Sequence, residues 1–278
     1  MASDASGNVF ITGAAAGIGA AVTRLLAADG YTVYAGVHSD SGSLDRITGV
    51  RQVPVDVTDP ASVAAAAEQV AAQAGRAGLR ALINNAGIIL QGPVELMDPT
   101  ELARQFAVNT LGPAHVVQAF LPLLRAGGGR VINIGAPTAR VAMPHLAALS
   151  GSKAALAAMS DALRLELADW NIPVIVVEPG ATDTRIFAKA TAAATISLKS
   201  ADPGRVALYE RQLSAVAKAS ARQRMAPVDP VAKTIAAAVR AARPRRHYTV
   251  GAEARMAGVL AVLPAGIKER LITRLLGL

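Results

Sequence analysis

A glycine-rich turn near the N-terminus has the residue types that bind a phosphorylated ligand. It follows a short apolar segment and comprises Thr12, Gly13, Ala14, Ala15, Ala16, Gly17, Ile18 and Gly19. Residues without a Cβ allow a pyrophosphate to approach the first N–H groups of the following helix, whose dipole favours an anion. The turn therefore predicts a dinucleotide site, with Thr12, Gly13, Ala16, Gly17, Ile18 and Gly19 in contact with the ligand, and an ordinary glycine-rich loop is the alternative for this segment alone.

Other segments resemble the short-chain dehydrogenase/reductase family in the same order along the chain. After the TGxxxGxG turn come Asn84-Asn85-Ala86-Gly87, Val108-Asn109-Thr110-Leu111-Gly112, Ser152-Lys153-Ala154-Ala155 and Pro179-Gly180-Ala181-Thr182-Asp183-Thr184. The tail around Arg246–Gly251 is also similar to the steroid and retinol dehydrogenase branch. This resemblance implies an NAD(P)-dependent oxidoreductase.

The same resemblance assigns further positions to a cofactor site. Lys153 would hold the nicotinamide ribose, and Asn109 would hold a water molecule near Lys153. The remaining cofactor contacts implied by the family are Asp56 and Val57 at the adenine, then Asn85, Ala86 and Gly87, and finally Pro179, Gly180, Thr182 and Thr184 at the nicotinamide end.

The choice between NAD and NADP depends on the end of the second expected strand. An acid there would bind the ribose 2′-hydroxyl of NAD, but the residue is Val37. His38 follows, where NADP-using relatives often have Arg, and Ser39 and Ser41 can hydrogen-bond a phosphate. The sequence favours NADP, with NAD as the less favoured cofactor and an exposed, unliganded His38 as the alternative.

The family's catalytic hydroxyls are missing. The family places Tyr four residues before its Lys and Ser thirteen residues before that Tyr, but these positions hold Leu149 and Ala136. Neither side chain can give a proton to a carbonyl oxygen or polarise it, and each lost function typically costs about a hundredfold in rate.

Three functions remain open. The protein is a reductase of an imine, an activated double bond or an activated carbonyl in a small apolar substrate, or an isomerase or cyclase with a bound cofactor, or a silent dinucleotide-binding protein. In a reductase the proton would come from Thr138, His145, Gln91 or water, and Arg140 would orient an anionic substrate. For Thr138 and His145, a local structural hydrogen bond is the simpler alternative.

The elements that must position these residues alternate between strands and helices, which predicts one α/β Rossmann domain over 1–278 with a doubly wound parallel sheet. The expected strands are Val9–Thr12, Thr32–Val37, Gln52–Val55, Ala81–Asn84, Arg130–Ile134, Val174–Glu178 and Arg246–Val250. The expected helices are Ala20–Asp29, Ser62–Ala74, Pro99–Leu124 and Ser150–Asp169. A substrate lid is expected at 186–227 and a closing amphipathic helix at 252–278.

Composition excludes several other classes. The chain has no Cys, so it has no disulfide scaffold or thiolate zinc site, and we expect no metal. The net charge is +8, but aromatic residues make up only 3%, which argues against nucleic-acid binding. The polar start and the absence of a long apolar run predict a cytoplasmic protein without a membrane span. The family resemblance implies a homodimer or homotetramer formed by the helices that hold Asn109 and Lys153.

Overall fold

One parallel sheet organises the chain. The structure, a computed structural model, describes residues 7–38 and 44–278. Its seven-stranded sheet has the order β3-β2-β1-β4-β5-β6-β7, and each neighbouring pair is parallel. The strands are β1 (Asn8–Thr12), β2 (Thr32–Val37), β3 (Val50–Pro54), β4 (Ala81–Asn84), β5 (Val131–Ile134), β6 (Val174–Pro179) and β7 (His247–Val250). The predicted doubly wound Rossmann fold is confirmed, and its switch point lies between β1 and β4.

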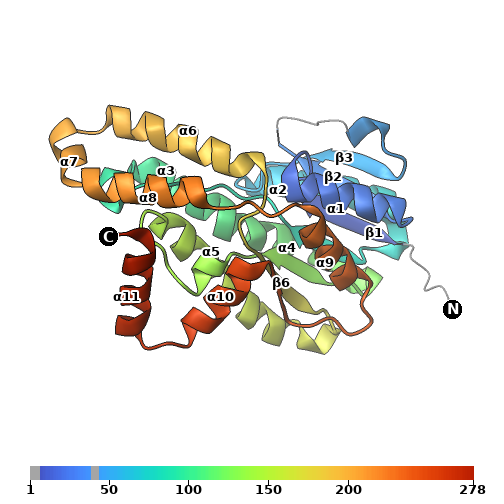
Figure 1. The fold of residues 1–278 in the computed structure, drawn as a ribbon. Helices are drawn as coiled ribbons and strands as arrows, with labels where there is room; N and C mark the ends of the chain where they lie inside the picture. The colour runs from blue at the N-terminus through green and yellow to red at the C-terminus, as the bar shows by residue number, and fades with distance from the viewer. Residues whose placement is uncertain (1–6, 39–43) are drawn as a thin grey trace.

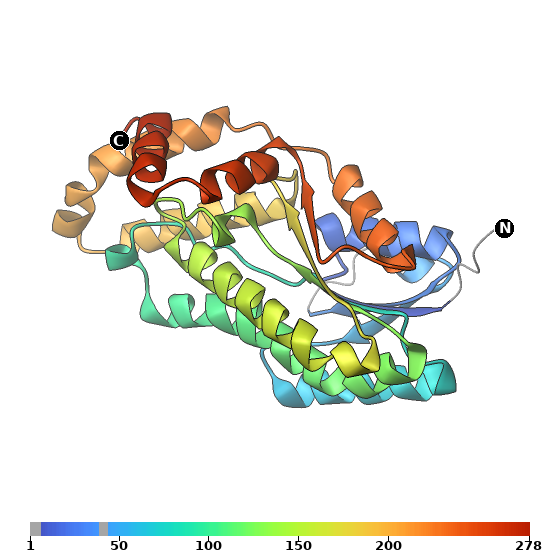
Figure 2. The ribbon, with the colours of Figure 1, turned by 90° about the horizontal axis from the view of Figure 1, so that it is seen from below.

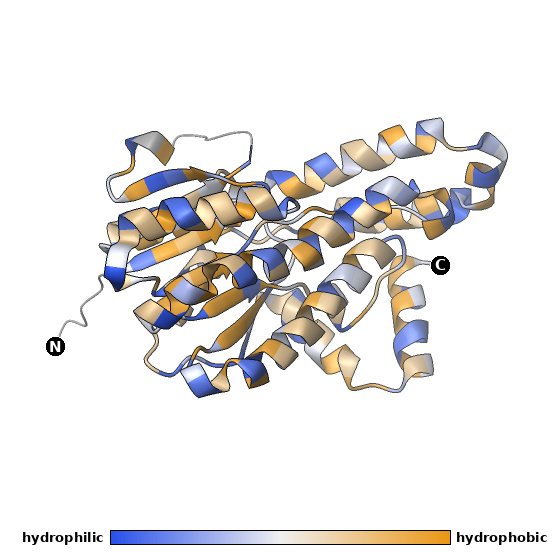
Figure 3. Cartoon of the chain, turned by 180° about the vertical axis from the view of Figure 1, so that it is seen from behind, coloured by the Kyte–Doolittle hydropathy of each residue, from blue (hydrophilic) through white to orange (hydrophobic). Residues whose placement is uncertain are grey.

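Helices cover both faces of this sheet (Figure 1). One face packs on α1 (Gly17–Ala28) and α9 (Asp229–Arg240), and the other on α2 (Pro60–Ala74), α4 (Gly112–Gly127) and α5 (Ala147–Glu166). Strand β1 shows why both faces are apolar, because Val9 and Ile11 enter the first core while Phe10 stacks on Phe120 of α4 in the second. The apolar strands are visible inside the helical layers in Figure 3.

Local sequence explains where several helices begin. Asp59 caps α2 by accepting a hydrogen bond from the N–H of Ala61, and Asp98 caps α3 (Pro99–Phe106) in the same way through Thr100. Each helix starts with a proline, whose missing N–H costs nothing at that position. The short helices are η1 (Leu44–Arg46), η2 (Gly75–Ala77), η3 (Val94–Leu96), η5 (Pro137–Ala139) and η6 (Ala168–Trp170).

The helix expected over Pro99–Leu124 is present, but it contains a π-helical turn that the sequence did not predict. The structure divides it into α3, one π-helical turn η4 (Ala107–Leu111) and α4. Pro113 has no N–H to donate to the carbonyl of Asn109, four residues earlier, so the regular α-helical ladder cannot continue through this point. The π turn therefore coincides with Asn109.

The regions expected as a lid and as one closing helix are each divided into helices. Residues after β6 form α6 (Arg185–Ser200), α7 (Pro203–Leu208) and α8 (Glu210–Arg222), which extend beyond the sheet at the end opposite the N-terminus (Figures 1 and 2). The single helix over 252–278 is wrong, because Pro264 separates α10 (Ala252–Ala261) from α11 (Ala265–Leu276). Helix α9, absent from the sequence prediction, fills the gap between the lid region and β7.

Candidate functional site

The glycine turn has the shape that a pyrophosphate needs. Gly13 has a φ of +65°, and a Cβ built on Gly19 would lie 2.2 Å from the carbonyl oxygen of Gly13. Ala16 precedes α1 without a side-chain cap, so no side chain satisfies the first N–H groups of that helix. An anion fits this cradle, because the helix dipole faces a turn in which Gly13, Gly17 and Gly19 carry no side chain.

Two of the expected contact residues, Thr12 and Asn85, also hold the turn in place. The hydroxyl of Thr12 accepts hydrogen bonds from the N–H groups of Asn85, at 3.1 Å, and Ala86, at 3.0 Å. Asn85 donates from Nδ2 to the carbonyl oxygens of Thr12 and Gly13, at 3.0 and 3.1 Å. These four bonds join the loops after β1 and β4, so Thr12 and Asn85 shape the cradle through its backbone.

Asn109 is held at the end of the loop after β4. It is fully buried, its Oδ1 accepts from the N–H of Ile88 at 2.9 Å, and its Nδ2 donates to the carbonyl of Ile88 at 3.0 Å. A further bond of 3.3 Å joins Nδ2 to Ser152 Oγ on α5. The π turn, the β4 loop and α5 thus meet at one side chain.

Lys153 lies beside this asparagine. A Cβ built on Gly87 would be 3.4 Å from Asn109 Oδ1 and 3.8 Å from Lys153 Nζ, so the absence of a side chain at Gly87 leaves space next to both groups. Lys153 Nζ donates to the carbonyl of Ile134 at 2.6 Å, and burial lowers the pKa of the amine to about 8. The structure thus brings Asn109, Gly87 and Lys153 together.

Apolar groups occupy the positions next to Lys153. Leu149 lies one turn earlier on the same face of α5 and is buried, and Ala136 follows β5 with an extended backbone. Neither offers a hydroxyl to a ligand. The polar chemistry of this region depends on the residues around them.

Two of those residues have buried polar atoms without a hydrogen-bond partner. These are Thr138 Oγ1, in the short helix η5, and His145 Nε2, in the loop before α5. His145 has a left-handed backbone with a φ of +63°, burial lowers its pKa, and Gln212 of α8 partly opposes that shift. Both atoms can serve a ligand, because neither is engaged within the described chain.

At the adenine end, His38 and Asp56 form a pair. His38 Nε2 lies 3.4 Å from Asp56 Oδ2, and the His38 side chain is 69% exposed. Hydrogen bonds from the hydroxyl and N–H of Thr58 lower the pKa of Asp56, and His38 adds a smaller effect. Val57 is buried against Gly112, so its side chain belongs to the core, and Ser39 lies outside the described residues.

The loop after β6 is fixed by residues that the sequence prediction missed. The N–H of Ala181 donates to Glu253 Oε2 of α10 at 2.8 Å, and Gln223 Nε2, just after α8, donates to Glu253 Oε1 at 3.1 Å. Thr182 Oγ1 donates to the carbonyl of Gly180 at 2.9 Å. The only sequence signal for Glu253 was an acid in the first turn of the closing helix.

The other expected residues of this loop occupy its two ends. Pro179 ends β6, and the N–H of Gly180 bonds to the carbonyl of Val250 on β7 at 2.9 Å. Thr184 precedes α6 and lies against Gly17, where a Cβ would be 2.9 Å from Thr184 Cγ2. The end of the Pro-Gly loop therefore lies beside the glycine turn at Gly17.

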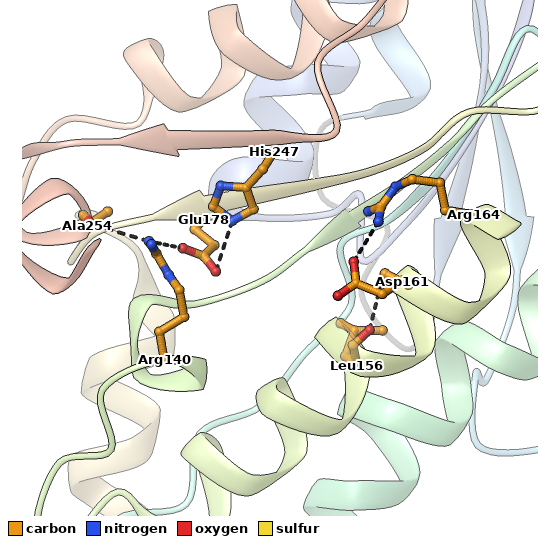
Figure 4. A network of polar contacts seen from close by, with 8 residues as sticks. Arg140, Leu156, Asp161, Arg164, Glu178, His247 and Ala254 are labelled. Atoms are coloured by element: carbon orange, nitrogen blue, oxygen red, sulfur yellow. Dashed lines mark hydrogen bonds and ion pairs between the residues drawn. The ribbon is translucent and has the colours of Figure 1, made fainter. Parts of the chain in front are cut away.

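A buried acid at the end of β6 was also missed. Glu178 is 2% exposed, its Oε2 accepts from Arg140 Nη2 at 2.5 Å, and its Oε1 lies 3.0 Å from His247 Nε2 (Figure 4). Arg140 Nη2 also reaches the carbonyl of Ala254 at 3.3 Å. The guanidinium of Arg140 is therefore engaged in contacts within the chain, which weakens the prediction that Arg140 orients an anionic substrate.

Comparison with known proteins extends over most of the chain. The family model described as "short chain dehydrogenase" matches residues 7–195. A protein from Xenorhabdus hominickii named 3-amino-tetrahydro-pyrrolizinone reductase is 32% identical over 251 residues, which cover 89% of this chain and 88% of the relative.

Two further comparisons agree with that match. Human 17-beta-hydroxysteroid dehydrogenase type 2 is 37% identical over 185 residues, which cover 64% of this chain and 48% of that protein, so the chain spans about half its length. The crystal structure of a short chain dehydrogenase from Burkholderia cenocepacia J2315 in complex with NADP has a TM-score of 0.73 at 30% identity, covering 96% of this chain and 97% of that one.

Proposed function

Since the chain belongs to the short-chain dehydrogenase/reductase family of oxidoreductases, we propose that it is an NADP(H)-dependent reductase of an imine or another activated acceptor in a small apolar substrate. The proposal rests on one contrast: the residues that form the dinucleotide cradle are present, whereas the positions that would polarise and protonate a carbonyl are apolar. Gly13, Gly19, Asn109 and Lys153 keep a dinucleotide site, whereas Ala136 and Leu149 remove the hydroxyls next to it.

The preference for NADP rests on the end of β2. Val37 leaves the strand without an acid that would repel a 2′-phosphate, and the exposed ring of His38 can donate a hydrogen bond to it. The NADP in the Burkholderia cenocepacia structure is consistent with this choice. Bound and reduced, the cofactor would supply a hydride.

The chain's own groups then define what can accept that hydride. Lys153 would bind the nicotinamide ribose, and Gly87 leaves room beside it, while Leu149 and Ala136 exclude water without polarising a carbonyl. An imine that arrives protonated needs no acid from the protein, because its nitrogen already carries the proton. The Xenorhabdus hominickii relative is named for a nitrogen heterocycle, which agrees with such an acceptor.

For acceptors that need a proton, Thr138 and His145 are the candidates. Thr138 Oγ1 and His145 Nε2 are buried without a hydrogen-bond partner, but burial lowers the pKa of His145, which disfavours the protonated ring that would donate a proton. The lid of residues 186–227 would close the site, because His145 already contacts Gln212 of α8.

The proposal includes a homodimer or homotetramer in the cytoplasm. Leu165 on α5 is 80% exposed, and Leu111, the last residue of η4, is 51% exposed, so each of these elements carries an apolar side chain without cover within one chain. Leu165→Asp should lower the mass measured by light scattering if these helices form the interface.

A paired substrate assay tests the function. NADPH oxidation is followed with a cyclic imine and with the cyclic ketone of the same ring size, and we expect kcat/KM for the imine to be larger by at least about a hundredfold. Faster ketone reduction would contradict the proposal. Product formation without net NADPH oxidation would favour the isomerase or cyclase, and dinucleotide binding without any product would favour the silent protein.

A further inference from the structure

Helix α11 carries an apolar stripe that the fold does not cover. Ile267, Leu271 and Leu275 are 50%, 44% and 66% exposed, and their spacing of four residues places them on one face of the helix. The inward side of α11 is formed by Ile272 and Leu276, which pack in the small core around Val141. The outward stripe is therefore additional to what anchors the helix.

Cations border that stripe. By helical geometry Arg270 and Arg274 lie along one edge and Lys268 along the other, whereas Glu269 falls on the far side. An apolar stripe between basic residues is the pattern of a helix that lies in the interface of an anionic membrane. The alternation of apolar and polar residues along α11 is visible in Figure 3.

Exposed apolar side chains are also present in the segment just before α11. Val262, in the turn between the two helices, is 82% exposed, and Val259 and Met256 on α10 are 66% and 51% exposed. Helix α11 stands at the end of the molecule beside α8 (Figures 1 and 2). Among the helices of residues 7–38 and 44–278, none has both the length and the hydropathy of a membrane span.

We propose that α11, with the turn at Val262, binds the surface of an anionic lipid bilayer. Ile267, Leu271 and Leu275 enter the boundary between headgroups and acyl chains, and the flanking Arg and Lys side chains meet the lipid phosphates. A second copy of this chain is a poorer occupant, because an interface that used the same stripe twice would bring Arg270 and Arg274 towards their own copies.

Vesicle sedimentation of the full chain tests this surface. The vesicles contain either phosphatidylcholine alone or phosphatidylcholine with phosphatidylglycerol. We expect binding to the anionic vesicles only, weakened by salt. Arg270→Ser with Arg274→Ser should lower the partition coefficient roughly twenty-fivefold, at about fivefold for each cation. Ile267→Ser with Leu271→Ser should abolish binding.

A matched control changes the same charge elsewhere. Arg24→Ser with Arg76→Ser removes two exposed cations from other surfaces and should lower binding less than threefold. Urea midpoints show that each variant is folded. The proposal is overturned if folded wild-type protein ignores anionic vesicles, if both Arg pairs have equal effects, or if the Ile267 and Leu271 changes lower only the oligomer mass, which would identify a second copy as the occupant.

Discussion

The amine of Lys153 lies 2.6 Å from the carbonyl oxygen of Ile134, the last residue of β5. Burial alone accounts for the lowered pKa of this amine, since no charge is among its causes. The end of β5 therefore holds the buried amine of Lys153 next to the space beside Gly87. A ligand hydroxyl placed there would meet a strong donor near neutral pH.

That burial predicts a pH-dependent stability. Lys153 has a folded-state pKa of about 8 against an ordinary value of 10.5, so the unfolded chain binds more protons between these values. The free energy of unfolding should rise from pH 8 towards pH 10.5, and the cost of burying the charged amine should be fully present below pH 8. The gain is up to about 3 kcal/mol.

Urea unfolding at pH 7 and pH 10 measures this effect, with Lys153→Met as the control. The methionine keeps an unbranched side chain but has no proton to lose. A wild-type protein whose pH dependence equals that of the variant would contradict the assigned pKa of Lys153.

Restoring both hydroxyls should restore ketone chemistry. Leu149→Tyr with Ala136→Ser places a phenol one turn before Lys153 and a hydroxyl after β5, and kcat/KM for a ketone should rise by about a hundredfold or more. Leu149→Phe with Ala136→Ser is the matched control, since it adds the ring without the acid. Equal rates for the two variants would show that the site has diverged beyond its missing groups.

Gly19→Ala should remove dinucleotide binding. The added Cβ would lie 2.2 Å from the carbonyl of Gly13, so the turn must open. The increase in Tm produced by NADPH should fall to near zero. Gly266→Ala is the control, because a Cβ there meets nothing within 4 Å. An unchanged NADPH-dependent shift in Gly19→Ala would contradict the assigned cradle.

His38→Asp should change the cofactor preference. A carboxylate at the end of β2 repels a 2′-phosphate and can accept a bond from a 2′-hydroxyl. We expect the Kd for NADPH, measured by calorimetry, to rise at least about tenfold, while the Kd for NADH changes by less than about threefold. Arg76→Asp, at an exposed position, is the control. His115→Asp is unsuitable, because His115 on α4 contacts the Val57 carbonyl. Equal losses for both cofactors would indicate general damage.

The Arg140–Glu178 pair should respond asymmetrically to substitution. Arg140→Met leaves a carboxylate that is 2% exposed, with His247 as its remaining partner, and should cost about 3 kcal/mol of unfolding free energy. Glu178→Gln leaves an Arg140 side chain that is 31% exposed and can be hydrated, so it should cost less. Denaturant unfolding of both variants measures the difference, and a larger loss for Glu178→Gln would contradict this account.

Local patterns in the sequence determined the sheet and the cofactor turn. Thr32–Val37 and Ala81–Asn84 were predicted with the observed bounds, because short apolar segments between turn residues specify buried parallel strands without help from distant residues. The missing hydroxyls at Ala136 and Leu149 could also be read directly, since their positions follow from the spacing to Lys153.

Tertiary structure decided which polar groups are paired within the fold. Sequence spacing cannot show that Asn85 and Thr12 join the loops after β1 and β4, or that Glu178 pairs with Arg140, because these bonds join residues far apart in the chain. The outward stripe of α11 was likewise invisible, since Ile267 and Ile272 are equally apolar in sequence and only packing buries one of them. Apolar periodicity in a sequence shows which side chains tend to avoid water. The tertiary fold determines which partner covers each of them.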